Sequence, residues 1–502
     1  MATEPPSIAD WFAKKNVLVT GGTGFMGKVL ISKLLLSCPD LDNIFVIIRK
    51  KKGVDSQTRL HLMLQQEPFR NLREEYPERL KKLTAIVGET TVQGLSLSDA
   101  DKELLLSRVS VIFHMAADIR FDQSLKAAVK TNVAGVVNIV AFAKQMPLLE
   151  SFIHVSTSFC QCGESVLEER AYRTSVAPES IIAMVNTMTN EVLEIMTPKL
   201  LGSQPNTYAY SKALCEDVVS GCGLPAGIIR PSIVVASLKE PVPGWVDNLH
   251  GPTGLIIGAG KGVIRSMLCN ANLMADLLPC DIAINATIAL AWQVGLKKPV
   301  EPLFLNVTIN QENSISWSDA LETGRKHTLA NPFSRKEPLW YPGGNFTSSR
   351  IRHWFSVLLL HLIPAYLLDT IFIITGNKPF LVRVQARVKS GLNLLQYYTT
   401  KQWIFRNDNL RDLQGRLCPA DKETFYMDTN IIHWDEYILT YILGTRQYCL
   451  KDDPSTLPRA RQVLMYLYFA DCLLKILLGC FIIWLMYTWM NSAKSIMAML
   501  VE

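Results

Sequence analysis

Short apolar runs alternate with longer helical patterns over the first 230 residues of the chain. The runs are Val17–Val19, Ile44–Ile48, Leu83–Val87, Val109–Phe113, Phe152–Val155 and Ala226–Ile229. This order is typical of parallel strands joined by crossover helices. We therefore predict a Rossmann-like α/β fold with a doubly wound parallel sheet. Ligands of such folds bind at the carboxyl edge of the sheet.

The pattern changes twice further along the chain. Glycine and proline are frequent between Ser232 and Trp340, which predicts irregular segments that shape a substrate cleft. After Pro342-Gly-Gly344 the sequence becomes helical, aromatic and cationic. We predict three parts: a nucleotide-binding domain with cleft insertions over 1–345, a helical C-terminal domain over 346–455, and a membrane-inserted helix over 466–490.

One apolar stretch in the predicted helical domain has an ambiguous pattern. The run Phe355–Thr375 is long enough to span a bilayer, but His361, Pro364 and Asp369 interrupt it. A charge in hydrocarbon is costly. We therefore expect a buried or membrane-apposed helix here rather than a membrane span.

A second apolar stretch near the C-terminus favours a membrane anchor. The run Cys472–Met490 carries a single charge, Lys475, which can snorkel to the surface, and aromatic residues that suit a membrane interface. We predict a C-terminal anchor that leaves the catalytic body in the cytosol, with a helix in a soluble core as the alternative. The endoplasmic reticulum and the peroxisome both accept such anchors.

The composition excludes several classes of protein. The chain has 502 residues, of which 49% are hydrophobic, so it is too apolar to be disordered. Its net charge of +6 is spread along the sequence, and we expect no nucleic-acid partner. Eleven cysteines occur without a C-x-x-C pair or a neighbouring group of histidines. This usage favours reduced thiols and predicts no metal site.

A glycine-rich turn follows the first predicted strand. In the run Thr20-Gly-Gly-Thr-Gly-Phe-Met-Gly27, Gly21, Gly24 and Gly27 recur at every third position, and a helical pattern follows at once. Glycine at these positions lets the backbone approach a pyrophosphate, while the free N–H groups of the helix N-terminus face the anion. We predict a dinucleotide site, whose contacts also include Thr23, Phe25 and Met26.

Basic residues follow the second predicted strand. The run Arg49-Lys-Lys-Lys52 stands where an NAD-dependent protein usually has an acidic residue for the ribose 2′-hydroxyl. Cations at this position favour a 2′-phosphate, so we predict NADPH as the cofactor. Arg49 and Lys50 are the better candidates, whereas Lys51 and Lys52 are interpreted as part of a solvated loop.

A tyrosine and a lysine four residues apart form the main candidate for catalysis. In Asn206-Thr-Tyr-Ala-Tyr-Ser-Lys212, Tyr208 and Lys212 share a face if the segment is helical. A nearby ammonium lowers the pKa of a phenol, which ordinarily lies at about 10. The spacing predicts Tyr208 as a proton donor tuned by Lys212, although such a pair also occurs on protein surfaces. Tyr210 has Leu214 at the same spacing and is interpreted as a packing residue.

Hydroxyl groups follow the fifth predicted strand. The run His154-Val-Ser-Thr-Ser158 places them at the carboxyl edge of the sheet, where a hydrogen bond can polarise a substrate carbonyl. Thr157 is the first candidate for this role. Ser156 and Ser158 are interpreted either as helpers or as caps of the strand end.

Small residues follow the fourth predicted strand. In His114-Met-Ala-Ala117, Ala116 and Ala117 let a cofactor pass close to the backbone, and His114 is interpreted as structural. Asn132 either orders a backbone or water near the lysine or satisfies a helix kink.

These motifs resemble the extended short-chain dehydrogenase/reductases and, within them, the alcohol-forming fatty acyl-CoA reductases. The resemblance rests on Thr20–Gly27, His114–Ala117, Ser156-Thr157, Tyr208–Lys212, Ile229–Ser232, Glu240–Asn248, Gly251–Gly254, Gly260–Gly262, His361–Asp369 and His433–Tyr437, and it covers nearly the whole chain. Two positions depart from the pattern. Gly88-Glu89 stands where relatives usually have Gly followed by Asp, and Phe159-Cys-Gln-Cys162 replaces a typical Ala-Tyr pair.

The resemblance implies that a long-chain fatty acyl-CoA is reduced with NADPH to a primary alcohol and CoA, through an aldehyde, beside membrane lipid. It gives Tyr208 the protonation step, Lys212 the cofactor ribose, and Thr157 with Ser156 the substrate oxygen, and it adds Pro231 to the cofactor contacts. Two alternatives are a reductase of the same superfamily that acts on a sterol or another carbonyl lipid, and a membrane-tethered cofactor-binding scaffold without turnover.

Overall fold

The computed structural model describes residues 5–50, 53–334 and 338–501, the last eight of these by their backbone only. Seven parallel strands of this described chain form one sheet: β1 (Asn16–Thr20), β2 (Asn43–Ile48), β3 (Leu83–Val87), β4 (Val109–His114), β5 (Ser151–Val155), β7 (Ala226–Pro231) and β12 (Leu303–Val307). Their order is β12-β7-β5-β4-β1-β2-β3. The predicted doubly wound parallel sheet is confirmed, with β12 as a strand that the sequence did not reveal.

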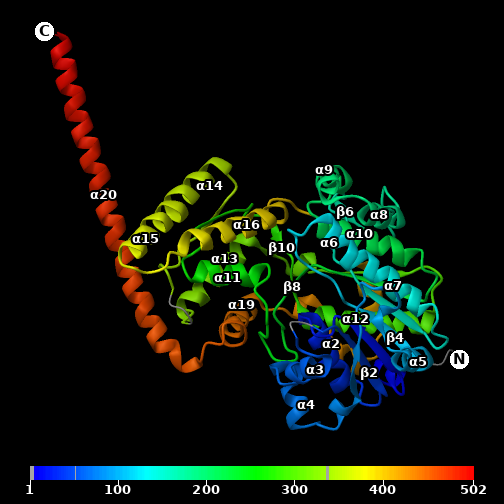
Figure 1. Cartoon of the computed structure of the whole chain (residues 1–502). Coiled ribbons are helices and arrows are strands. Elements are labelled where there is room, and N and C mark those ends of the chain that lie inside the picture. Colours follow the sequence, from blue (N-terminus) through cyan, green and yellow to red (C-terminus); the bar gives the residue numbers. More distant parts are fainter. Residues whose placement is uncertain (1–4, 51–52, 335–337, 502) are drawn as a thin grey trace.

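Both faces of this sheet are covered by helices (Figure 1). Val17 and Val19 of β1 belong to the core shared with α2 (Phe25–Ser37) and α12 (Cys280–Lys297). Leu18 belongs to a second core, shared with helices α7 (Ala134–Ala143) and α10 (Thr207–Ser220). Since successive side chains of a strand point to opposite faces, two covered faces require the nearly continuous apolar strands seen in the sequence.

The order of strands reverses between β1 and β4, because the chain first builds outward to β3 and then returns to the other side of β1. In open α/β sheets, the carboxyl ends of the strands at such a reversal frame a ligand crevice. The turn after β1 and the segment after β4 therefore lie at the position where the fold binds ligands.

Shorter elements connect and cover the sheet. Besides the helices named above, residues 5–334 contain α1 (Ile8–Phe12), α3 (Ser56–Leu64), α4 (Arg70–Glu74), α5 (Asp99–Arg108), α6 (Leu125–Ala128), α8 (Pro178–Thr187), α9 (Asn190–Leu201), α11 (Pro252–Gly260) and α13 (Trp317–Ala330). Short strands outside the main sheet are β6 (Val166–Leu167), β8 (Ile233–Val235), β9 (Ser266–Leu268), β10 (Met274–Ala275), β11 (Leu277–Pro279), β13 (Ile315–Ser316), β14 (Asn345–Thr347) and β15 (Ile404–Phe405).

The C-terminal part is helical, as predicted. It contains α14 (Arg350–Val357), α15 (Ile363–Ile374), α16 (Leu381–Thr399), α17 (Asp408–Arg416), α18 (Pro419–Thr424), α19 (Trp434–Gly444) and α20 (Leu457–Val501). A π-helical turn, Leu358–Leu362, joins α14 to α15. Leu413 of α17 and Tyr441 of α19 share the core of α2 and α12. The boundary proposed at residue 345 stays a prediction, since residues on both of its sides build this core.

The predicted anchor lies within α20, which extends away from the body of the molecule (Figure 1). This helix is long and apolar enough to cross a membrane, and large side chains such as Ile483, Trp484 and Trp489 are exposed along it. The alternative of a helix in a soluble core is therefore wrong. Residues 125–143 satisfy the same criteria of length and apolarity, but they are mostly buried in the body.

The continuous helix over residues 350–374 corrects the expectation of a buried helix in this region. Its apolar side chains, Phe355, Leu367 and Ile371 among them, are exposed, and the segment is long and apolar enough to cross a membrane. Asp369, whose charge counted against lipid contact, is buried against the protein instead. The membrane-apposed alternative stays a prediction.

The turn after β1 tolerates no side chain at two of its glycines. Gly21 has a φ of +74°, and a Cβ on it would lie 2.8 Å from the backbone nitrogen of Ala116. A Cβ on Gly27 would lie 2.6 Å from the Cα of Gly22 and closer still to the carbonyl oxygen of Gly21. The first turn of α2 therefore packs directly on the turn that precedes it.

We predict that Gly27→Ala destabilises the protein by about 1–3 kcal/mol, because the backbone atoms around the new methyl group cannot move cheaply. Gly391→Ala is the matched control, since no atom lies within 4 Å of a Cβ in this position of α16. This control should be neutral or slightly stabilising. Denaturant unfolding of the detergent-solubilised protein measures both, and equal stability of the two variants would contradict the packing described.

One ion pair is fully enclosed between β7 and α10. Nε and Nη2 of Arg230 donate to the carboxylate of Glu216 over 2.8 and 2.7 Å, and the two side chains are 0% and 1% exposed. The guanidinium also donates to the carbonyl oxygens of Glu168 and Arg170. The Arg230–Glu216 pair thus holds the segment after β6 against β7 and α10.

Glu216→Gln should destabilise the fold by about 3–5 kcal/mol, since it leaves the buried Arg230 charge uncompensated. Glu168→Gln is the control, because the Glu168–Arg170 pair is exposed, and it should not change stability measurably. The same unfolding assay applies. An unchanged midpoint for Glu216→Gln would mean that the enclosed charge pair does not contribute to stability.

Candidate active site

The glycine turn and the segment after β4 meet at the carboxyl edge of the sheet. The Ala116 N–H group donates to Thr20 Oγ1 over 3.3 Å, and Ala117 follows in the same half-buried segment. Gly24 is the N-cap of α2 and provides no side chain for capping, so the first N–H groups of this helix, including those of Phe25 and Met26, have no side-chain cap. A glycine cradle and an uncapped helix N-terminus fit the pyrophosphate of a dinucleotide.

Two arginines lie beside this turn. Arg59 of α3 donates from Nη2 to Thr23 Oγ1 over 3.3 Å and from Nη1 to the Arg49 carbonyl oxygen over 2.5 Å. The Arg49 side chain is 55% exposed and lies 3.8 Å from the Glu89 carboxylate. Burial, with a contribution from the Arg49 charge, lowers the pKa of Arg59. Two neighbouring cations beside the glycine turn suit a phosphate.

The other basic residues of the run after β2 are Lys50, Lys51 and Lys52. Lys50 is exposed, and Lys51 and Lys52 lie outside the described residues. Arg59 was missed by the sequence analysis because it follows the strand by eleven residues. Only the folding of α3 back onto the end of β2 brings its guanidinium to Thr23.

Tyr208 and Lys212 lie in the N-terminal half of α10. The side chain of Asn206 caps this helix by accepting a hydrogen bond from the Ala209 N–H group over 2.9 Å. Lys212 Nζ donates to the Val155 carbonyl oxygen at the end of β5 over 2.6 Å. The helical spacing and this bond direct the face that carries both residues toward the carboxyl ends of the strands.

The expected lowering of the Tyr208 pKa is wrong for this structure. Burial, with contributions from the neighbouring Cys160 and Cys215 thiols, raises the pKa of Tyr208 above its usual value, and burial lowers the pKa of Lys212. The lysine ammonium is hydrogen-bonded to Val155. Tyr208 therefore stays protonated at neutral pH, and such a phenol can donate a proton to an alkoxide, which is a far stronger base.

The three hydroxyls after β5 differ in their hydrogen bonds. Ser158 Oγ donates to the Arg230 carbonyl oxygen over 2.7 Å. Thr157 Oγ1 accepts a bond from the Phe159 N–H group over 3.2 Å, which leaves its own proton free to donate. Ser156 Oγ is buried and forms no hydrogen bond with the described residues. The geometry favours Thr157 as the donor to a substrate oxygen. Pro231, whose carbonyl oxygen accepts from the Ser158 N–H group, lies beside this run.

The Tyr208 ring lies at one end of an aromatic cluster that no local sequence pattern indicates. The ring of Phe121, after β4, stacks on Tyr208 with centroids 5.6 Å apart, and its centroid lies 5.5 Å from that of Tyr398 on α16. Phe159, after β5, packs edge-on against Tyr398 at 5.3 Å. The Asn206 amide donates to the Tyr398 hydroxyl over 2.9 Å. The helical C-terminal part therefore reaches the neighbourhood of Tyr208.

Two further residues near the site act on the backbone. His114 is fully enclosed, its Nδ1 lies 2.7 Å from Thr20 Oγ1, and burial lowers its pKa to about 3, which suits the structural role expected. Asn132 lies in the π-helical turn Val129–Val133, bonds both backbone groups of Asp118 and donates to Ser211 Oγ. These bonds favour the interpretation that Asn132 orders a backbone near the lysine, since they lead to the loop after β4 and to the residue before Lys212.

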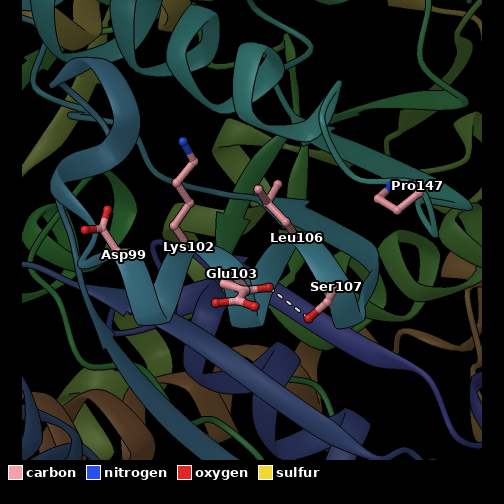
Figure 2. Close-up of a pocket in the computed structure, with 6 residues that line it drawn as sticks. All are labelled: Asp99, Lys102, Glu103, Leu106, Ser107 and Pro147. Atoms are coloured by element: carbon pink, nitrogen blue, oxygen red, sulfur yellow. Dashed lines mark hydrogen bonds between the residues drawn. The ribbon is translucent and has the colours of Figure 1, made fainter.

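A surface depression on α5 is separate from this site. It is lined by Asp99, Lys102, Glu103, Leu106, Ser107 and Pro147 (Figure 2). Ser107 Oγ donates to the Glu103 carbonyl oxygen within the helix. None of the predicted site residues lines this depression.

Comparisons with known proteins agree with the motifs. A family model described as male sterility protein, with NAD-binding in its name, matches residues 19–287, and a second model of the same description matches residues 360–452. Fatty acyl-CoA reductase 1 of Mus musculus is 39% identical over 91% of this chain and 88% of its own length. Fatty acyl-CoA reductase 2 of Bos taurus is 37% identical over the same shares.

Solved structures share the fold at low sequence identity. The reductase domain of a nonribosomal peptide synthetase from Mycobacterium tuberculosis superimposes with a TM-score of 0.57 at 16% identity, over 88% of this chain and 92% of that domain. This likeness concerns the fold alone, whereas the relatives above extend over nearly the whole sequence. The chain belongs to the fatty acyl-CoA reductases of the extended short-chain dehydrogenase/reductase superfamily.

Proposed function

We propose that this protein reduces long-chain fatty acyl-CoA to a primary alcohol with NADPH, through an aldehyde. The observation that carries the proposal is the position of Tyr208 and Thr157, which the fold brings to the carboxyl edge where the glycine turn meets the end of β4. Family membership favours this substrate class over a sterol. Because Tyr208, Lys212 and Thr157 are all present, a scaffold without turnover is disfavoured.

The bound nicotinamide supplies hydride to the substrate carbonyl. The Thr157 hydroxyl donates a hydrogen bond to the substrate oxygen, which stabilises the negative charge that develops there. Tyr208 donates its phenolic proton to the alkoxide of the second reduction. Lys212 keeps α10 against β5 through Val155. Its ammonium would also hold the cofactor ribose. The first reduction expels coenzyme A as a thiolate, and no covalent acyl-enzyme is needed.

The exposed C-terminal helix supports a membrane location for this reaction. Long acyl chains partition into a bilayer, and α20 would hold the reductase body beside it. We propose that the body faces the cytosol, at the endoplasmic reticulum or the peroxisome.

Tyr208→Phe should lower alcohol formation from palmitoyl-CoA by about 10²–10⁴-fold in kcat, because the variant lacks the proton donor. Binding of NADPH, followed by its fluorescence, should persist. Tyr210→Phe is the matched control, since the Tyr210 hydroxyl is buried and forms no hydrogen bond with the described residues. Mass spectrometry of the alcohol measures both variants, and full activity of Tyr208→Phe would remove the assignment.

The double variant Arg49→Ala/Arg59→Ala should reduce the preference for NADPH over NADH by about tenfold or more, because charged hydrogen bonds to the 2′-phosphate are lost. Steady-state kcat/KM with each cofactor gives this ratio. Arg108→Ala is the control, since this exposed arginine ends α5 just before β4, at the opposite edge of the sheet. A ratio that stays at the wild-type value in the double variant would place the 2′-phosphate elsewhere.

A further inference from the structure

The helix over residues 350–374 has its polar and apolar sides reversed relative to a helix of a soluble protein. Twelve large apolar side chains on it are exposed, among them Phe355, Leu359, Leu367 and Ile371. Its buried residues are His361, Ala365 and Asp369, which recur at every fourth position and form one stripe along the helix. An apolar surface of this extent marks an interaction site.

The buried stripe fastens the helix to the protein along its length. His353 Nδ1 lies 2.9 Å from Ser266 Oγ, and His361 Nε2 accepts a hydrogen bond from the Arg265 N–H group over 2.9 Å. The Asp369 carboxylate accepts three backbone bonds, each 2.9 Å long, from Phe380, Leu381 and Val382 at the start of α16. A membrane-spanning position would strip these polar groups of their protein partners, so the helix is suited to lie on a bilayer rather than to cross it.

Exposed basic residues precede and follow this helix in the sequence. Between residues 350 and 406 the sequence has eight lysines and arginines, and Asp369 is its only acidic residue. Arg350 and Arg352 stand at the start of the helix, Lys378 follows its end, and Arg383 and Arg387 project from α16, all of them exposed. An exposed apolar helix with exposed cations at its two ends and on the helix that follows matches the acyl chains and phosphate groups of an anionic lipid leaflet.

Arg265, which bonds His361 of this helix, also contacts α20. The Arg265 guanidinium lies 3.6 Å from the Asp471 carboxylate of α20, and Asp471 also accepts a bond from Trp340 Nε1 over 2.6 Å. Arg265 therefore contacts both the helix over 350–374, through its N–H group, and the proposed anchor, through its side chain. Exposed apolar side chains of α20 lie on both sides of this junction in the sequence, with Tyr466 and Phe469 before Asp471 and Leu473 after it.

We propose that the helix over residues 350–374 lies in the headgroup region of one leaflet, as a second membrane contact that sets the orientation of the body on an anionic bilayer. This goes beyond the proposed reduction and does not depend on it. The orientation has a consequence for the site, since Asp369 accepts hydrogen bonds from the first residues of α16, and α16 carries Tyr398, one ring away from Tyr208, near its other end.

The test places a fluorescent amino acid at Leu367 of the full chain and, in a separate variant, at Ile195 on α9. The two native side chains are 61% and 80% exposed, so neither substitution disturbs the core. Each variant is reconstituted in phosphatidylcholine vesicles with and without phosphatidylserine, and with lipid that carries a nitroxide near the top of its acyl chain. Aqueous iodide serves as the opposing quencher.

We expect the nitroxide lipid to remove most of the emission at Leu367, more strongly with phosphatidylserine, while iodide has little effect. The Ile195 probe should show the reverse. Iodide quenching at Leu367 equal to that at Ile195 would overturn the proposal. Protection from both quenchers would overturn it as well, because protein would then cover the face. Equal quenching at Leu367 with and without phosphatidylserine would refute the role of the basic residues. These readouts involve no turnover, so they stand apart from a failure of the proposed reaction.

Discussion

A single buried hydrogen bond, from Lys212 Nζ to the Val155 carbonyl oxygen, sets the geometry of the candidate site. It ties α10, which carries Tyr208, to the last residue of β5, the strand that the hydroxyls of Ser156, Thr157 and Ser158 follow. The enclosed Arg230–Glu216 pair fixes the next turn of α10 to β7. Both contacts are far from water, where a broken polar bond costs most, and together they hold α10, with Tyr208 on it, against β5 and β7.

The sequence contains enough information for the sheet and for the chemistry that one segment carries. The glycine turn and the Tyr208–Lys212 spacing are local patterns with a fixed geometry once strand and helix form. Residues from distant segments escaped prediction: Arg59 reaches Thr23 only because α3 folds back, and Tyr398 joins the aromatic cluster from α16. The pKa of Tyr208 was misjudged for a similar reason, since spacing reveals a neighbouring charge but not the burial that outweighs it.

The helix over residues 350–374 is a second example of a feature that depends on contacts between distant segments. The apolar composition of this helix predicts contact with lipid, whereas His361 and Asp369 argue against such contact. Only the folded chain shows that these two polar side chains face protein while the apolar side chains face outward. His361 and Asp369 therefore fasten to the protein a helix whose apolar side chains are exposed. Because α16 follows this helix and carries Tyr398, one element of the fold joins the helix to the aromatic cluster beside Tyr208.

The Tyr208 site is proposed to carry out both reductions of the thioester carbon. The most direct measurement uses palmitoyl-CoA with NADPH that carries deuterium as its transferable hydrogen, followed by mass spectrometry of the alcohol. Two successive reductions at the Tyr208 site predict two deuterium atoms on the first carbon of every alcohol molecule. An alcohol with one deuterium or none, or an aldehyde as the only product, would contradict this interpretation of the site.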